Sequence, residues 1–205
     1  SRDTMADWMP FPYARPEYRY SQAALTQHWA RLHRADAEPL PDDARVRAAW
    51  ALCHAGEFQR AMEAGLAAGG AGITVANKAQ AVHASYLEAS ESARLSMYAQ
   101  VVARAEAQIA AEPGNPNAHY WLAYALGRSG QGMRITKALS QGLSARVKAA
   151  LEKTIALAPT HADAHVALGT YHAEIIDKLG KLLASTQGAS KESGMKHFRE
   201  ALRLN

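Results

Sequence analysis

Cysteine, long apolar runs and strand-forming patterns are all scarce in this sequence. Cys53 is the single cysteine among 205 residues, which excludes an intrachain disulfide and a zinc site built from several thiolates. No apolar run reaches the length of about 18 residues that a membrane span needs, so membrane insertion is not expected. The start of the chain also lacks a basic stretch followed by an apolar core. We therefore expect a cytoplasmic protein, or a periplasmic one if a signal was removed before Ser1.

Strong charge and catalytic motifs are missing as well. The formal net charge is +4 with a pI near 9.2, and the basic residues are scattered, so nucleic acid is not indicated as a partner. The sequence has no Gly-x-Ser-x-Gly elbow, no HExxH motif and no Cys/His pairing. The paired carboxylates Asp42 and Asp43 suit the solvated start of a helix. These absences predict a protein that is not an enzyme and that uses no cofactor.

A repeat of about 46 residues organises the second half of the chain. Pro113 aligns with Pro159 and His119 aligns with His165, and the phrase Gln-Gly-x-Ser recurs at the same distance. Each copy has a proline-marked turn and two apolar-periodic segments separated by that phrase, which predicts a helical hairpin. Alanine-rich helices of this kind cannot bury their apolar faces alone. We therefore predict an all-α fold, a right-handed α-solenoid of stacked antiparallel hairpins.

These hairpins suggest a division of the chain into two domains. Residues 1–40 are expected to form an extended segment plus a capping helix, and residues 41–205 a helical repeat domain. The expected repeat units are 42–69, 70–112, 113–158 and 159–205. We expect Ser144 and Ser190 to be the N-caps of the second helices. Apolar spacing predicts inward faces in the last two units at Leu122, Leu126, Val147, Leu151, Ile155, Ala164, Leu168, Ile175, Leu179, Leu182, Met195, Phe198 and Leu202.

The first 20 residues differ from the rest, because prolines and aromatic residues alternate there. Pro10, Pro12 and Pro16 forbid a helix, whereas the aromatic side chains have much apolar surface to bury. We expect this extended segment to cover the first helices. Two alternatives are that it enters the binding groove as a built-in peptide, and that it is disordered.

Two further clusters could carry chemistry. Gly69-Gly70-Ala71-Gly72 could cradle a phosphate, but no Lys-Ser/Thr follows and no strand precedes it, so a helix stop and start is expected. His161, Asp163 and His165 lie close together and suggest a metal site. The interpretation that we favour is that His161 and Asp163 help to begin a helix while His165 packs within the repeat. No metal is expected.

Several phrases resemble tetratricopeptide repeats. The opening Ala164-His165-x-x-Leu168-Gly169 and the turn Gly56-Glu57-Phe58-Gln59-Arg60-Ala61 are similar to that family, although its period is 34 residues. The lengthened repeats, with Asn117-Ala118-His119-Tyr120-Trp121-Leu122-Ala123 and Glu152-Lys153-Thr154-Ile155-Ala156-Leu157-Ala158-Pro159, are similar to two groups. These are the T-component lipoproteins of TRAP transporters and the regulator-of-microtubule-dynamics proteins.

The resemblance implies that the first helix of each hairpin lines a concave groove. The residues that it places on this surface are Asn117, Tyr120, Tyr124, Arg128, Asp163, Thr170, Glu174 and Trp50. Such a mixture of aromatic, cationic and acidic groups suits a peptide, so we expect a non-enzymatic scaffold that binds a peptide or partner protein. The alternative is a component of a transport system that binds a small-molecule or lipid-like ligand, because longer hairpins can enclose an apolar cavity. We also expect an uncovered apolar edge on the last helix, which either further repeats or another copy would cover, and we predict a homo-oligomer formed through the C-terminal helix.

Overall fold

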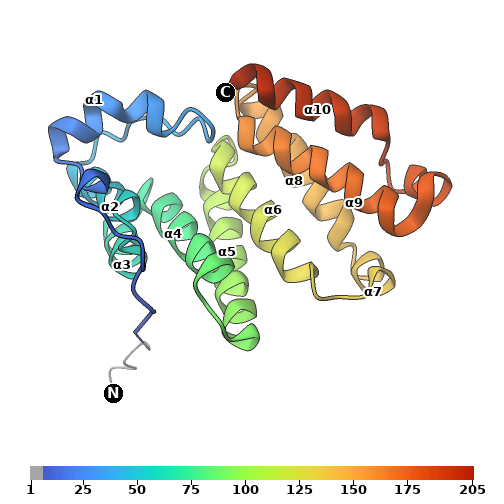
Figure 1. Ribbon diagram of the computed structural model, residues 1–205, viewed down its shortest axis with the longest axis horizontal. Helices are drawn as coiled ribbons and strands as arrows, with labels where there is room; N and C mark the ends of the chain where they lie inside the picture. The colour runs from blue at the N-terminus through green and yellow to red at the C-terminus, as the bar shows by residue number, and fades with distance from the viewer. Residues whose placement is uncertain (1–6) are drawn as a thin grey trace. The chain divides into compact units, whose positions relative to one another are not determined.

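The computed structural model describes residues 7–205, and within them every regular element is a helix (Figure 1). The elements are the 3-10 helix η1 (Pro16–Tyr18) and the α-helices α1 (Gln22–Leu32), α2 (Ala44–His54), α3 (Phe58–Ala68), α4 (Gly72–Tyr86), α5 (Glu91–Ala111), α6 (Pro116–Gly130), α7 (Ile135–Ser140), α8 (Leu143–Leu157), α9 (Ala162–Thr186) and α10 (Lys191–Leu204). The described residues contain no strand, which confirms the all-α prediction. None of their helices combines the length and hydrophobicity needed to cross a bilayer.

The chain forms two compact units. The first contains the described residues up to His28 together with Leu40–Arg104, and the second contains Trp29–Pro39 together with Ala105–Asn205. The boundary falls inside α1 and again inside α5, so each of these helices contributes to both units. The division into domains at residue 40 stays a prediction, because compact units need not follow repeat boundaries.

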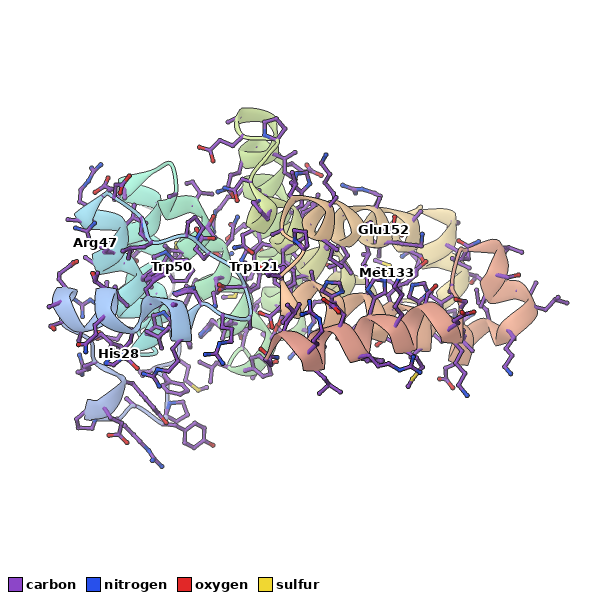
Figure 2. The ribbon with its side chains drawn as sticks, turned by 90° about the horizontal axis from the view of Figure 1, so that it is seen from above. His28, Arg47, Trp50, Trp121, Met133 and Glu152 are labelled. Carbon is purple, nitrogen blue, oxygen red and sulfur yellow. The ribbon has the colours of Figure 1, made fainter. Side chains whose placement is uncertain are left out.

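In the first unit, α2, α3 and α4 pack against one another. Asp43 caps α2, because its side chain accepts a hydrogen bond of 2.8 Å from the backbone N–H of Arg45. Val46, Trp50 and Cys53 follow at helical spacing, and all three side chains are buried. Trp50, labelled in Figure 2, is 1% exposed and belongs to this core.

The glycine-rich stretch ends α3 and begins α4, as expected. Gly69 and Gly70 have positive φ angles of 65° and 52°, which glycine adopts without strain. Close packing of the two helices also requires glycine, since a Cβ on Gly65 or Gly72 would collide with the carbonyl oxygen of the other residue. The α3–α4 hairpin is therefore tight because it has no side chains at this contact.

The same unit continues from α4 into the first part of α5. Gln80 is fully buried, and its amide donates hydrogen bonds to the carbonyl oxygen of Met97 at 3.0 Å and to Oε1 of Gln100 at 2.7 Å. Its own oxygen accepts a hydrogen bond of 2.8 Å from Arg104. One polar side chain of α4 thus holds three residues of α5 in register.

The N-terminal segment Trp8–Arg19, which we call the strap, lies against the first unit. The Trp8 ring stacks on His83 with ring centroids 4.5 Å apart, and the Trp8 backbone N–H donates to Oε1 of Gln59 at 3.0 Å. Phe11 lies against Gly56, where a Cβ would collide with its ring. These contacts match the covering role expected for the segment, of which residues 1–6 lie outside the described residues.

The second unit is built from two hairpins, in which α6 pairs with α8 and α9 pairs with α10 (Figure 1). Both hairpins open with the same hydrogen bond. His119 Nε2 lies 2.9 Å from the carbonyl oxygen of Pro113, and His165 Nε2 lies 3.1 Å from that of Pro159. The repeated histidine therefore fixes each first helix to the turn before it, which agrees with the packing role predicted for His165.

The residues that lengthen the repeat form a short helix in both copies. The helix α7 spans Ile135–Ser140, and a shift of about 46 residues places it on residues 181–186, the last turns of α9. Gly180, with φ 73° and ψ 163°, separates these turns from the rest of α9. The long first helix of the last unit is therefore kinked at Gly180. Gly142 and Gly188, with φ of 66° and 70°, follow the two short helices.

The cap prediction holds for one copy of the Gln-Gly-x-Ser phrase and is wrong for the other. The Ser190 side chain accepts a hydrogen bond of 3.1 Å from the N–H of Ser193 and caps α10. Ser144 lies inside α8, which begins after Gly142, and its hydroxyl donates to Tyr171 Oη at 3.2 Å. Gly142, in the αL conformation, occupies the N-cap position, so α8 begins at Leu143 and not after Ser144.

Some predicted inward positions are exposed. Leu182 is 84% exposed because it follows the break at Gly180, where the helical register changes. Met195 and Leu202 are 42% and 78% exposed. Instead, α10 packs through the stripe Gly194, Phe198 and Ala201, and a Cβ on Gly169 of α9 would lie 2.7 Å from the Phe198 ring. Leu126, Leu151, Leu168 and Ile175 are buried as predicted.

Candidate functional site

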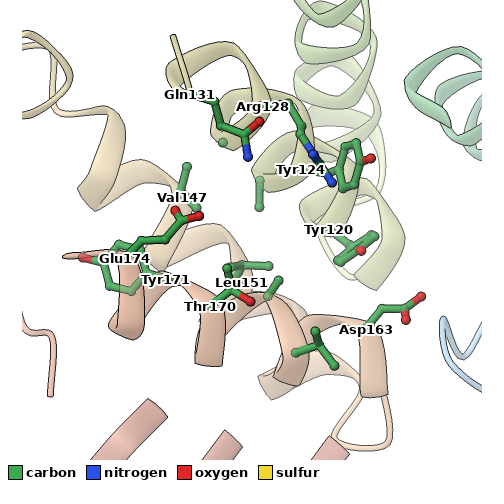
Figure 3. A pocket seen from close by; sticks show the side chains of 14 residues that line it. Tyr120, Tyr124, Arg128, Gln131, Val147, Leu151, Asp163, Thr170, Tyr171 and Glu174 are labelled. Atoms are coloured by element: carbon green, nitrogen blue, oxygen red, sulfur yellow. The ribbon is translucent and has the colours of Figure 1, made fainter. Parts of the chain in front are cut away.

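A pocket of about 270 Å³ lies in the second unit, between α6 and α9 with α8 contributing to its base (Figure 3). Its lining residues are Tyr120, Ala123, Tyr124, Gly127, Arg128, Gln131, Val147, Leu151, Asp163, Val166, Ala167, Thr170, Tyr171 and Glu174. The aliphatic side chains Val147 and Leu151 come from α8, whereas the polar groups come from α6 and α9. The pocket therefore has an apolar base and polar walls, a combination typical of binding sites.

The large side chains of the wall from α6 are spaced four residues apart. Tyr120, Tyr124 and Arg128 lie on one face because residues at i and i+4 are neighbours on a helix. The Arg128 guanidinium lies 5.1 Å from the centre of the Tyr124 ring, in the geometry of a cation–π contact, and Figure 3 shows the two side chains together. No ion pair joins Arg128 to a carboxylate of the described residues. Its hydrogen-bond donors are therefore available to a bound anion.

Tyr120 lies deeper in the same wall, 7% exposed, among other rings. Its ring centre is 4.9 Å from that of Trp121, which is labelled in Figure 2, and 4.8 Å from that of His161. Burial raises the pKa of the Tyr120 hydroxyl far above its usual range, and the carboxylate of Asp163 raises it further. At neutral pH the hydroxyl is thus protonated and able to donate a hydrogen bond.

The facing wall belongs to α9. Thr170 and Glu174, four residues apart, are both exposed, and Asp163 lies at the start of the helix. Within the described part of the chain, Glu174 forms no ion pair. A cationic wall on α6 therefore faces acidic groups on α9 across the pocket (Figure 3).

The structure brings six of the eight predicted residues to this pocket. Tyr120, Tyr124 and Arg128 come from α6, and Asp163, Thr170 and Glu174 come from α9. Trp50 does not belong with them, since it packs in the core of the first unit, where Lys78 Nζ lies 5.5 Å from its ring centre. That the six pocket residues contact a ligand stays a prediction.

Asn117, the remaining predicted residue, is part of a buried hydrogen-bond network. Its amide donates to the carbonyl oxygen of Asp36 at 2.9 Å and to Glu38 Oε2 at 2.6 Å, and its oxygen lies 2.7 Å from His161 Nε2. The N–H of Ala164 donates to His161 Nδ1, so Nε2 carries the ring proton and donates to Asn117. At 2% exposure Asn117 does not line the pocket.

The predicted set of site residues did not include those contributed by the second helix of a hairpin. Val147 and Leu151 of α8 form the base, and their spacing of four residues indicated only that they face inward. Tyr171 was missed because it lies next to Thr170, on a neighbouring face of α9. Its hydroxyl donates to the carbonyl oxygen of Gln187 at 3.1 Å while it accepts from Ser144. A burial pattern cannot reveal these two partners.

The histidine cluster that suggested a metal has structural roles. His161 caps α9 by accepting the N–H of Ala164 at 3.0 Å, and His165 faces the carbonyl oxygen of Pro159. Throughout residues 7–205, no group of three or more His, Cys, Asp or Glu side chains is arranged to hold a metal ion.

Fold and pocket together define an all-α protein of packed helical hairpins. Residues 74–205 match the family model described as regulator of microtubule dynamics protein 1-3, and the chain belongs to this family. This confirms one of the two similarities seen in the sequence. A comparison with curated proteins gave no match.

Proposed function

We propose that the chain is a non-enzymatic scaffold that binds a peptide segment of a partner protein in the pocket between α6 and α9. The single observation that carries the proposal is the arrangement of Arg128 and Glu174. Each is a charged side chain without an ion pair among residues 7–205, and both line one pocket with an apolar base. A segment with an acidic residue near Arg128 and a basic residue near Glu174 would satisfy both charges.

The size of the pocket also favours a peptide. Its volume of about 270 Å³ lies just below the range of roughly 300–1,000 Å³ for pockets that hold drug-sized ligands, but it accommodates one or two anchoring side chains. The likeness of the hairpins to tetratricopeptide repeats supports this mode of binding. The family description, which names a regulator of microtubule dynamics, supports a protein as partner.

The test is a selection of random peptides by display on the full chain. Wild type should enrich peptides with an acidic residue at one fixed position. Because a hydrogen bond to a charged group contributes about 1.5–3 kcal/mol, Arg128→Ala should lower the affinity for the best peptide by about 10- to 100-fold. The matched control is Arg146→Ala, since Arg146 lies outside the pocket, in an ion pair of 2.7 Å with Glu106. Equal enrichment on all three proteins would contradict the proposal.

A second candidate is a carrier of a small-molecule or lipid-like ligand, as the similarity to TRAP-transporter T-components suggests. The observation that favours it is the apolar base formed by Val147 and Leu151. Native mass spectrometry of the purified protein separates the two candidates. A bound ligand mass, lost in Leu151→Lys, would favour the carrier, whereas a ligand-free mass together with peptide enrichment would favour the scaffold.

We also infer self-association through α10. Met195 and Leu202 are seven residues apart, hence on one face of the helix, and both are exposed. An exposed apolar pair on a helix is suited to bury against a second copy.

A further inference from the structure

The strap occupies a second site, which lies on the first unit. We call this site the seat, and it consists of Gly56, Glu57, Phe58, Gln59 and His83. Four kinds of contact hold the strap there. They are the Trp8–His83 stack, the hydrogen bond from Trp8 to Gln59, the packing of Phe11, and an ion pair of 3.6 Å between Arg19 and Glu57.

These contacts are those of a bound peptide. The two aromatic anchors, Trp8 and Phe11, are three residues apart, and Pro10 between them keeps the backbone extended. Phe11 fits only because Gly56 has no side chain, and its ring centre also lies 6.0 Å from that of Phe58. The seat thus binds two aromatic rings, those of Trp8 and Phe11, and accepts a hydrogen bond from one backbone N–H, that of Trp8.

The strap leaves part of the seat unused. A cavity of about 280 Å³ remains between them, lined by Met9, Pro10 and Ala14 of the strap and by His83 of the seat. His83 is 1% exposed, and its Nε2 has no hydrogen-bond partner in the described part of the chain. Glu88 Oε2, at 3.9 Å, is too far from it for a hydrogen bond. A buried, unpartnered nitrogen beside a cavity is a group that a better ligand would satisfy.

We propose that the seat is a peptide-binding site for a partner protein, and that the strap is its built-in, exchangeable occupant. The partner segment has the pattern Trp-x-x-Phe with a proline between the aromatic residues. It also has, near the position of Met9, a larger polar side chain that fills the cavity and forms a hydrogen bond with His83 Nε2. A second copy of this chain is a poorer occupant, because its strap would leave the same cavity and the same nitrogen unused.

A partner segment must displace the strap from the seat, and this competition determines how tightly the segment has to bind. A strap tied to its seat by a short connection acts at an effective concentration of the order of millimolar, so a free peptide with the same sequence competes poorly. Weakening the strap should therefore reveal the site.

The experiment uses the full chain and, as probe, a fluorescein-labelled peptide with the sequence of residues 7–20. By fluorescence polarisation, Trp8→Ala/Phe11→Ala should bind the probe at least about tenfold more tightly than wild type, because its own strap no longer competes. The matched control Tyr18→Ala changes an exposed aromatic residue of the strap that lies outside the cavity, and should behave as wild type.

Two further arms make the result specific. A probe in which the residues equivalent to Trp8 and Phe11 are alanine should not bind, and this arm leaves the folded chain unaltered. Adding Phe58→Ala/Gln59→Ala to the strap variant should abolish binding of the original probe. No binding to any chain, or equal binding to wild type and the strap variant, would overturn the proposal. A wild-type dimer that dissociates in Trp8→Ala/Phe11→Ala would also overturn it, since the occupant would then be a second copy.

Discussion

At the scale of single residues, Asn117 connects three segments through one buried amide. It binds Asp36 and Glu38 in the segment after α1 and His161 at the start of α9. The N–H of Asp163 adds a hydrogen bond of 3.0 Å to the carbonyl oxygen of Ala35. These bonds hold Trp29–Pro39 in the second unit, next to the helix starts that carry Tyr120 and Asp163.

Replacing Asn117 should therefore cost stability. In Asn117→Ala the Glu38 carboxylate and the His161 ring each lose a buried hydrogen bond, so the free energy of unfolding should fall by about 2–4 kcal/mol. The control is Asn115→Ala, which removes only an exposed bond to Glu112 and should cost under about 0.5 kcal/mol. Urea unfolding measures both, and similar losses in the two variants would show that the network contributes little.

At the scale of helices, histidines from α9 and α10 line the contact between the two elements. His165 Nδ1 lies 3.0 Å from His197 Nδ1, and His172 stacks on His197 with ring centroids 6.1 Å apart. His165 Nε2 carries the ring proton, because it donates a hydrogen bond to the carbonyl oxygen of Pro159, so in the neutral pair His165 Nδ1 accepts a hydrogen bond from His197 Nδ1. The contact is thus built for uncharged rings.

This contact predicts a loss of stability in acid. Burial is the main cause that lowers the pKa of both His172 and His197. Lys148 adds to the effect on His172, and His165, His172 and Lys196 add to that on His197, whereas Glu152 opposes both shifts. The unfolded chain then binds protons more readily than the folded chain. The stability from these rings is present above the ordinary pKa of about 6.5 and is lost as pH falls below it.

His197→Gln should reduce this dependence on pH. The variant keeps a hydrogen-bond donor beside His165 but cannot be protonated, so the slope of unfolding free energy between pH 7 and pH 5 should be shallower than in wild type. Urea unfolding at several pH values measures the slope, and His28→Gln in the first unit is the control. An unchanged slope in His197→Gln would mean that other groups cause the acid sensitivity.

At the scale of the whole molecule, the exposed edge of α10 predicts association between copies. Leu202→Lys places a charge in the inferred contact and should convert a dimer or higher assembly into a monomer, as measured by light scattering at tens of micromolar. The matched control is Leu95→Lys on α5, where an exposed leucine lies outside the contact. A monomeric wild type, or equal effects of both substitutions, would contradict this inference.

The helices and the hairpins were predictable from the sequence because they depend on local patterns. The residues of the pocket walls came instead from the resemblance to tetratricopeptide repeats, which placed Tyr120, Tyr124 and Arg128 on one surface and, through the repeat, the corresponding positions of α9. The structural role of Asn117 was not predictable, since Glu38 lies 79 residues away in the sequence. The exposure of Leu182 was missed for a different reason, because it depends on the backbone conformation of Gly180.

The division of the chain has a practical consequence for shortened proteins. The backbone passes from one unit to the other after His28, after Pro39 and after Arg104, so neither unit can be excised as one continuous piece. A fragment trimmed to residues 74–205, the extent of the family match, would retain Asn117 but discard Asp36 and Glu38. Any truncation meant to preserve the pocket must begin no later than Trp29.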